Sequence, residues 1–146
     1  MLGKQNVIAF VATKEPERAK NFYSEVLGLR LMGDTPFALE YDAGGTMLRV
    51  SKVEKMTPAP YTVLGWRVTS IRKVVADLER KGVKFERYKG LPQDDLGIWT
   101  SPGGHQVAWF KDPDGNTLSL TQFLPSPSPK EKVELPQRSQ AKSDSS

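Results

Sequence analysis

The stretch KDPDGNTLSL, residues 111–120, decides the fold, because an earlier stretch of the chain matches it without a gap. YDAGGTMLRV, residues 41–50, superposes on it at a constant offset that aligns Asp42 with Asp112. Both stretches place apolar residues around a turn rich in Asp and Gly, a pattern typical of a β-hairpin. The match indicates an internal duplication, in which two similar units follow one another.

The first half of the chain reads as one such unit. An apolar strand at 6–13 precedes a helix, for which Pro16 suits the first turn and Gly28 the position just past the end. Three strand patterns follow, LRLMG, FALEYD and TMLRVSKV, and the turn 42–45 joins the last two. The first half therefore predicts a βαβββ unit.

The second half repeats this order after a Pro-rich connector, KMTPAPY. The strand TVLGWRV leads to a helix, for which Ser70 is a good N-cap and Gly82 the closing residue. We expect further strands at VKFERYK (83–89) and GIWTS, and in a hairpin of HQVAWFK with NTLSLTQF. The second half therefore predicts another βαβββ unit.

Composition restricts the classes of protein to which the chain can belong. With 146 residues, 38% hydrophobic and 26% charged, it fits one globular domain. The absence of cysteine excludes disulfides, thiolate metal sites and cysteine nucleophiles. Apolar runs are too short for a membrane span or a signal peptide, so we expect no membrane partner and a cytoplasmic location.

The charge of the chain favours an anionic small molecule as partner. The formal net charge is +4 and the pI is about 9.3, which attracts anions. The basic residues are scattered, and stretches such as 79–84 fall on or after a predicted helix, where they read as a solvated face. We therefore expect no nucleic-acid partner.

The end of the chain, 124–146, differs in kind from the rest. It alternates Pro with Ser and then mixes both signs of charge with few apolar residues. Such a segment cannot bury enough apolar surface to offset its ordering entropy, so we expect a disordered tail. The folded domain is then 1–123, with modules at about 5–54 and 61–123. The tail is either an inert terminus or a partner-binding segment.

Three motifs in these modules resemble a known family. ERAKNFYSEVLGL (17–29), a helix ending in KGV (81–83) and DPDGN are similar to the glyoxalase / bleomycin-resistance / extradiol-dioxygenase superfamily, also called the vicinal oxygen chelate superfamily. The resemblance covers about 5–123. It implies an α+β fold in which two βαβββ modules form a curved mixed sheet around a cavity, and a homodimer. This fold hosts lyases, dioxygenases, epimerases, antibiotic-modifying enzymes and binding proteins, so the function must be argued from the site.

The resemblance also locates the metal ligands of the metal-dependent members. These are His, Gln or Glu side chains on the first and last strand of each module. Here the corresponding positions are occupied by Ile8, Arg49, Val63 and Ser119. None of these side chains is a good ligand for a divalent cation, and a guanidinium opposes one electrostatically. The resemblance therefore implies the family fold with no metal and no cofactor.

Two arginines are candidates for contacting an anion in the cavity. If Arg49 points into the cavity, it clamps a substrate carboxylate or phosphate, pairs with an internal Asp or Glu, or reaches solvent at the sheet edge. Arg67 shares parity with Val63 in its strand, so we expect it to face the same cavity.

The last hairpin supplies further candidate residues. Symmetric pairing about Asp114 sets Trp109 opposite Ser119 and places both on the cavity side, while Phe110 and Leu118 pack under the helices. Trp109 is then either a stacking wall for a planar ligand or ordinary core. We expect Trp66 to pack against a helix.

Candidates for proton transfer are few. His105, the one histidine, has an unperturbed pKa near neutrality, although a His beside a Gly-Gly turn is more often a surface residue. Asp94 and Asp95 are adjacent carboxylates that can raise one another's pKa, or simply part of a polar loop.

These observations support four hypotheses of function. The first is a metal-independent protein that binds a small organic anion in its cavity. The second is a metal-dependent lyase or dioxygenase of the same superfamily, and the third is an antibiotic-binding resistance protein. The fourth is a partner-binding module that uses the tail. We prefer the first, because the metal ligands are missing from the positions that the resemblance assigns to them.

Overall fold

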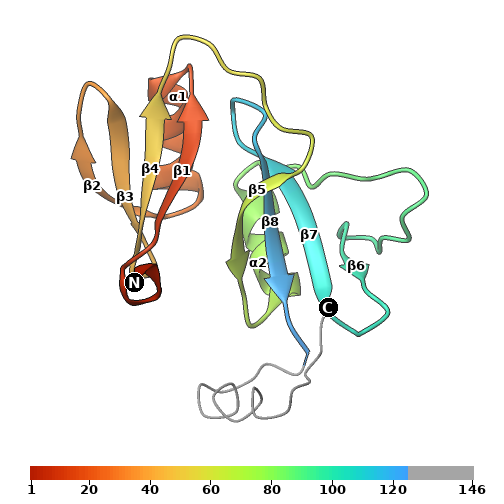
Figure 1. Cartoon of the computed structure of the whole chain (residues 1–146). Coiled ribbons are helices and arrows are strands. Elements are labelled where there is room, and N and C mark those ends of the chain that lie inside the picture. Colours follow the sequence, from red (N-terminus) through yellow and green to blue (C-terminus); the bar gives the residue numbers. More distant parts are fainter. Residues whose placement is uncertain (125–146) are drawn as a thin grey trace.

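The computed structural model describes residues 1–124, and it contains two βαβββ modules in the predicted order (Figure 1). The expected tail, apart from Leu124, lies outside the described residues. The elements in chain order are η1 (Leu2–Lys4), β1 (Ile8–Thr13), α1 (Pro16–Asn21), η2 (Phe22–Val26), β2 (Arg30–Asp34), β3 (Ala38–Ala43), β4 (Thr46–Lys52), β5 (Thr62–Arg67), α2 (Ile71–Arg80), β6 (Trp99–Thr100), β7 (Gln106–Lys111) and β8 (Thr117–Gln122). The predicted α+β class with two modules is confirmed.

Each module forms its own four-stranded mixed sheet. The strand orders are β1-β4-β3-β2 and β5-β8-β7-β6, so the two modules share one topology. In each sheet the first and last strands of the module pair in parallel, and the other neighbours are antiparallel. This places the first and last strands side by side at the centre of the molecule, where the family's site is expected.

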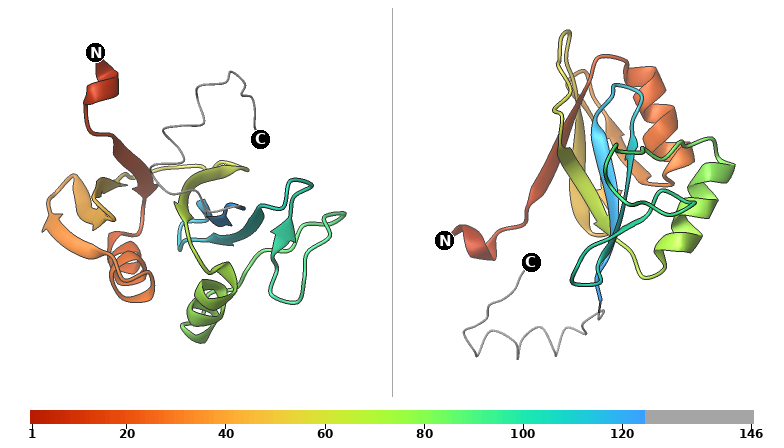
Figure 2. Two further views of the ribbon diagram at one scale, coloured as in Figure 1. Left: turned by 90° about the horizontal axis from the view of Figure 1, so that it is seen from below. Right: turned by 90° about the vertical axis from the view of Figure 1, so that its right-hand side faces the viewer.

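The helices of both modules cover the same side of the two sheets (Figure 2). Alternate strand residues that face them are buried, as Val11 is in β1 and Leu48 and Val50 are in β4. In the second module Phe110 and Leu118 are completely buried, as the pairing of the last hairpin predicts. Trp66 stacks on Phe110 of β7, with ring centroids 6.5 Å apart, and so packs against the core beneath the helices.

The first helix begins and ends where the sequence predicts. Pro16 is its first residue, and Gly28 lies just beyond its end at φ 75°, a conformation that glycine adopts without strain. Its second half, η2, widens into a π-helical turn in which the N–H of Leu27 donates to the carbonyl of Phe22 at 2.9 Å. This turn carries Tyr23, which is completely buried.

Ser70 is the N-cap residue of α2 as predicted, but the expected capping bond is absent. The Ser70 side chain makes no cap hydrogen bond. Instead the N–H of Ile71 donates to Oε1 of Gln122 at 2.7 Å, so a side chain at the end of β8 satisfies the helix start.

The strand predicted at 83–89 is wrong. In this segment the N–H of Glu86 donates to the carbonyl of Trp109 at 2.8 Å, but no ladder forms. The Gln93 side chain accepts the N–H of Tyr88 at 2.7 Å and donates to the carbonyl of Glu86 at 2.9 Å. Because a side chain satisfies these backbone groups, the segment needs no sheet partner. The third strand of the module is the short β6.

The DPDGN turn after β7 connects the two modules. Oδ1 of Asp112 accepts the N–H groups of Asp114 and Asn116, both at 2.9 Å, which fixes the turn. Oδ2 of Asp112 accepts the Tyr23 hydroxyl at 2.7 Å, and the Asn116 amide donates to the carbonyl of Ala12 at 2.9 Å. The turn of the second module is therefore bound to the strand and helix of the first.

Among residues 1–124, no helix combines the length and the apolar character needed to cross a membrane.

Candidate functional site

The sheet face opposite the helices is the candidate ligand-binding surface, and we call it the open face. Its strands alternate, so that Phe10 is 58% exposed while its neighbour Val11 is 6% exposed. Further apolar side chains exposed on these strands are Ile8, Met47 and Val63. No other part of the described chain covers this group of side chains, which marks the open face as a surface for binding.

The four positions that correspond to metal ligands all lie on strands of the open face. In the first sheet, Arg49 of β4 pairs with Phe10 of β1, two residues after Ile8. In the second sheet, Ser119 of β8 pairs with Gly65 of β5, and Val63 lies at a bulge between Thr62 and Leu64. The structure therefore places Ile8 and Arg49 on neighbouring strands of the first sheet, and Val63 and Ser119 on neighbouring strands of the second, without making either pair direct register partners.

The side chains at these positions do not fit a divalent metal. Two are aliphatic, one is a guanidinium, and the Ser119 hydroxyl is the one oxygen donor. No cluster of three or more His, Asp or Glu side chains that could hold a metal occurs within residues 1–124. The carboxylate on the facing strand, that of Glu40, is already bound to Arg49.

Arg49 forms an internal ion pair with Glu40, which is one of the alternatives that the sequence left open. The two residues are directly opposite one another on β4 and β3, and Nη1 of Arg49 donates to Oε2 of Glu40. Both side chains are mostly buried, at 29% and 23% exposed. Gly33 leaves the space for this pair, because a Cβ there would lie 2.9 Å from Oε1 of Glu40. The positive charge of Arg49 is therefore already balanced.

Arg67 is in a different electrostatic position. Its guanidinium carbon lies 4.6 Å above the centroid of the Phe123 ring, a cation–π contact. Within the described residues it makes no ion pair with a carboxylate. Arg67 pairs with Thr121 on β8 and shares the open face with Ser119. Its charge is available to an external anion.

An aromatic cluster lies beside Ser119. The predicted register is confirmed, since Trp109 pairs with Ser119. The Trp109 ring contacts Tyr88 and Trp99, with centroids 5.4 Å and 6.2 Å away. Burial raises the pKa of Tyr88, and the nearby carboxylate of Glu86 adds to that rise. This cluster offers flat apolar surface at one side of the candidate site.

The Ser119 hydroxyl is buried between Gly65 and Trp109. Ser119 is 7% exposed, and a Cβ on Gly65 would lie 2.7 Å from its Oγ. No hydrogen bond to this hydroxyl is formed within residues 1–124. A buried hydroxyl without a partner is costly, so it is suited to bind a polar ligand atom.

His105 lies where the chain turns into β7, next to the end of β8. Its Nδ1 accepts the N–H of Leu124 at 2.9 Å, and its ring packs edge-on against Phe123 at 5.1 Å. The Nδ1 lone pair is therefore in use, so Nε2 carries the proton of the neutral ring and can donate a hydrogen bond to a ligand.

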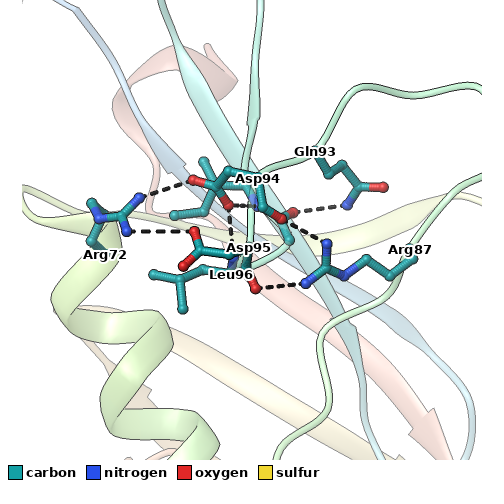
Figure 3. A network of polar contacts seen from close by, with 8 residues as sticks. Arg72, Arg87, Gln93, Asp94, Asp95 and Leu96 are labelled. Atoms are coloured by element: carbon teal, nitrogen blue, oxygen red, sulfur yellow. Dashed lines mark hydrogen bonds and ion pairs between the residues drawn. The ribbon is translucent and has the colours of Figure 1, made fainter.

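Asp94 and Asp95 belong to a loop that two arginines hold in place (Figure 3). Arg72 of α2 donates to Asp94 at 2.9 Å and lies 3.7 Å from Asp95, while Arg87 donates to the backbone carbonyls of both. Burial alone would raise the pKa of Asp94, but hydrogen bonds from the N–H groups of Ile98 and Leu96, together with the Arg72 charge, lower it below its ordinary value. Asp94 is therefore held ionised.

Several residues of the open face were missed in the sequence. The partner of Arg49 could have been found, because pairing the strands symmetrically about the turn 42–45 sets Glu40 opposite it. Tyr88 and Trp99 lacked a signal, since one lies outside any strand and the other in a strand of two residues. Gly65 could have been assigned to the open face, because it lies two residues before Arg67 in the same strand.

Comparisons with known proteins agree with this architecture. The model of the Glyoxalase/Bleomycin resistance protein/Dioxygenase superfamily matches residues 4–120. No curated protein matches the sequence.

Solved structures resemble the chain over most of its length. A glyoxalase/bleomycin resistance protein/dioxygenase from Alicyclobacillus acidocaldarius has a TM-score of 0.63 and 16% identity, over 83% of this chain and 92% of that one. A lactoylglutathione lyase from Agrobacterium tumefaciens has a TM-score of 0.63 and 14% identity, over 81% and 93%. A glyoxalase family protein from Enterococcus faecalis has a TM-score of 0.60 and 24% identity, over 83% and 99%. At these identities the likeness shows the fold alone.

Two observations lead to one conclusion: the chain contains two repeated βαβββ modules, and the family model matches residues 4–120. The chain belongs to the Glyoxalase/Bleomycin resistance protein/Dioxygenase superfamily.

Proposed function

We propose that the chain is a metal-independent binding protein for a small organic anion, which lies on the open face over the second sheet. The observation that carries this proposal is the guanidinium of Arg67, which faces the open side without a carboxylate among the described residues. A cation in that position attracts a carboxylate or phosphate group. The net charge of +4 supports the same sign of ligand.

Two neighbouring groups complete the proposed contacts. The unpartnered hydroxyl of Ser119 is one strand away from Arg67 and can bind a second polar atom of the ligand. Trp109, on the next strand, offers a face to a planar ligand. The expected ligand is therefore a planar anion, bound by charge at one end and by stacking at the other.

Arg49 has a lesser part in this proposal than Arg67. Its charge is balanced by Glu40, so an external anion must compete with a carboxylate that is already in place. Ile8 and Val63 contribute apolar surface around the ligand.

Metal independence rests on the chemistry of the donors. A hydroxyl, a guanidinium and two aliphatic side chains cannot replace the His, Gln or Glu ligands that the resemblance implies. We propose no proton transfer by His105, because its Nδ1 accepts the N–H of Leu124 and its Nε2–H can then only donate a hydrogen bond.

We further propose a homodimer in which a second copy helps to cover the open face. Phe10 is 58% exposed and Ile8 is 46% exposed on this face, an unfavourable arrangement for a chain that stays alone in water. Sedimentation of Phe10→Glu beside the unchanged chain tests this, and we expect the variant to be monomeric. A monomeric unchanged chain at micromolar concentration would rule out the dimer.

Titration calorimetry with 1-naphthoate and its neutral counterpart 1-naphthamide tests the anion site. We expect saturable binding of the carboxylate, at least tenfold weaker in Arg67→Ala and less than twofold changed in Lys73→Ala, a matched cation outside the site. Equal affinity for the acid and the amide would contradict the proposal. Stoichiometric zinc or nickel retained after purification would contradict metal independence.

A further inference from the structure

The two modules also meet on the helix side, where a cavity of about 380 Å³ follows the line between them; we call it the seam cavity. The first module contributes residues of α1 and η2. The second module contributes the chain after α2 and the turn after β7. The lining residues used below are Arg18, Phe22, Val26, Lys81, Lys84 and Lys111. The seam cavity lies on the other side of the sheets from the open face, because it is lined by the helices.

The lining of the seam cavity is strongly basic. Arg18, Lys81, Lys84 and Lys111 face two acidic residues, Glu86 and Asp112. None of the four basic side chains forms an ion pair with Asp or Glu within residues 1–124. The ammonium of Lys81 instead lies 3.5 Å from the carbonyl oxygen of Glu25, so it reaches from the second module to the first.

The acidic residues do not neutralise this lining. The carboxylate of Asp112 accepts hydrogen bonds from Tyr23, from Asn116 and from two N–H groups of its own turn. Its charge is therefore already solvated by donors inside the protein. With both carboxylates counted, four cations against two anions still leave an excess of positive charge, which attracts an anion with more than one negative charge.

The base of the seam cavity is apolar. Phe22 is 9% exposed, and its ring packs against Phe110 with centroids 6.4 Å apart. Val26 lies one turn further along η2. The seam cavity is open to solvent, and its volume of about 380 Å³ is large enough for a small molecule with one apolar end and one charged end.

We propose that the seam cavity binds a small organic phosphate, a dianion that carries an apolar group. Lysine ammonium groups bind phosphate as point charges, and a dianion matches the excess of positive charge. The apolar group lies on Phe22 and Val26. Because the ligand contacts both modules, its binding stabilises their association. The site is separate from the anion site proposed on the open face.

Phenyl phosphate is the probe for this site, with inorganic phosphate and phenol as probes that lack one of its two parts. In two-dimensional ¹H–¹⁵N NMR spectra at low salt, we expect saturable shifts at residues 18–26 and 81–86. We expect phenyl phosphate to bind at least tenfold more tightly than either partial probe. Shifts that do not saturate, or equal affinity for phenyl phosphate and phosphate, would overturn the proposal.

Reversing the charge of two lining residues tests whether they bind the phosphate group. We expect Arg18→Glu/Lys84→Glu to weaken phenyl phosphate binding at least tenfold. Lys73→Glu/Lys89→Glu changes the net charge by the same amount outside the cavity and should alter binding less than twofold. If the first pair does not fold, Arg18→Gln/Lys84→Gln replaces it, with at least a threefold loss expected. An equal loss in both pairs would mean binding by net charge alone, which contradicts the site.

The Arg67→Ala variant separates the two proposals. We expect its seam residues to shift with phenyl phosphate as in the unchanged chain, even where naphthoate binding is lost. Loss of the shifts at 18–26 in this variant would overturn the seam site and leave the open-face proposal standing.

Discussion

The hydroxyl of Thr13 donates a 2.5 Å hydrogen bond to Oδ2 of Asp114, although the two residues are 101 positions apart. The other oxygen of the same carboxylate accepts the N–H of Lys14 at 2.9 Å. Thr13 is completely buried and Asp114 is 9% exposed. The end of β1 and the turn after β7 are therefore joined by a charged acceptor that is largely shielded from water, and this contact is sensitive to any loss of a donor.

Replacing Thr13 tests the strength of that contact. We expect Thr13→Val to lower the free energy of unfolding by about 1–3 kcal/mol, because the Asp114 carboxylate keeps its burial but loses one donor. Urea denaturation measures the change. Thr46→Val, at an exposed strand position, is the matched control and should stay within about 0.5 kcal/mol of the unchanged chain. Equal effects of the two substitutions would show that the contact contributes nothing.

Because of Tyr23, we expect the free energy of unfolding to fall as the pH rises in the alkaline range. Burial raises the pKa of Tyr23 far above its ordinary value, and the nearby Asp112 and Asp114 raise it further. A raised pKa in the folded state gives stability that is complete below the unfolded pKa of about 10 and is lost as pH rises. Above that pH we expect this tyrosine to lower the free energy of unfolding by about 1.4 kcal/mol per pH unit.

Denaturation at pH 9, 10 and 11 measures this slope. Tyr23→Phe should be less stable at pH 7, by about 1–3 kcal/mol, since the Asp112 carboxylate loses a hydroxyl donor. Its stability should fall less steeply above pH 10. Tyr61→Phe is the control, because Tyr61 is 67% exposed. A slope in Tyr23→Phe as steep as in the unchanged chain would contradict the assignment.

Because of Asp94, we expect the free energy of unfolding to fall as the pH is lowered into the acid range. The pKa of Asp94 is lowered in the folded state, although burial opposes the change, by two backbone N–H groups and by Arg72. Its contribution is therefore present above the unfolded pKa of about 3.9 and is lost as pH falls through the folded pKa. Because the pair is partly exposed, we expect Asp94→Asn to cost less than about 1 kcal/mol at pH 7.

The difference in stability between Asp94→Asn and the unchanged chain should shrink as the pH falls through the unfolded pKa of about 3.9 and then through the lower folded pKa. Asp95→Asn is the control, since the Asp95 side chain is 81% exposed and lies 3.7 Å from Arg72. A constant difference at pH 7 and pH 3 would mean that the loop depends on the shape of the Asp94 side chain and not on its charge.

Gly65 and Ser119 should behave as a coupled pair. A Cβ on Gly65 would lie 2.7 Å from Oγ of Ser119, closer than side chains pack. We expect Gly65→Ala to destabilise the fold by about 1–3 kcal/mol, and Ser119→Ala to recover most of that loss in the double variant. Denaturation of the four chains measures the coupling. Additive effects would show that the cost of Gly65→Ala does not come from a clash with the Ser119 hydroxyl.

The sequence predicted the hairpin of β7 and β8 down to its register, because a turn as rich in Asp and Gly as DPDGN fixes which residues face each other. It failed at 83–89, where alternating residues suggested a strand. There the polar side chain of Gln93 satisfies the backbone, and a periodicity argument does not include such a contact.

In the candidate site, too, some features could be predicted from the sequence and others could not. The position of Ser119 followed from the resemblance to the family, and that of Arg49 followed from the internal repeat. The contact between His105 and Leu124 joins a loop to the chain beyond β8, so no local pattern predicts it. The choice between an anion clamp and an ion pair for Arg49 required the register of β3, which places Glu40 opposite. Local spacing locates a residue, but its partner depends on the packed fold.

The bond between Tyr23 and Asp112 also has a consequence during protein synthesis. The ribosome completes the first module well before it reaches the DPDGN turn, so the phenol is made long before its acceptor. Until Asp112 is made, the first module has two unfavourable choices. If the Tyr23 ring is buried, its hydroxyl lies among apolar atoms without an acceptor, and if the ring is exposed, the core of the first module is not filled. A nascent chain released before residue 112 should therefore be a target for proteases, and the finished protein should gain its resistance in one late step.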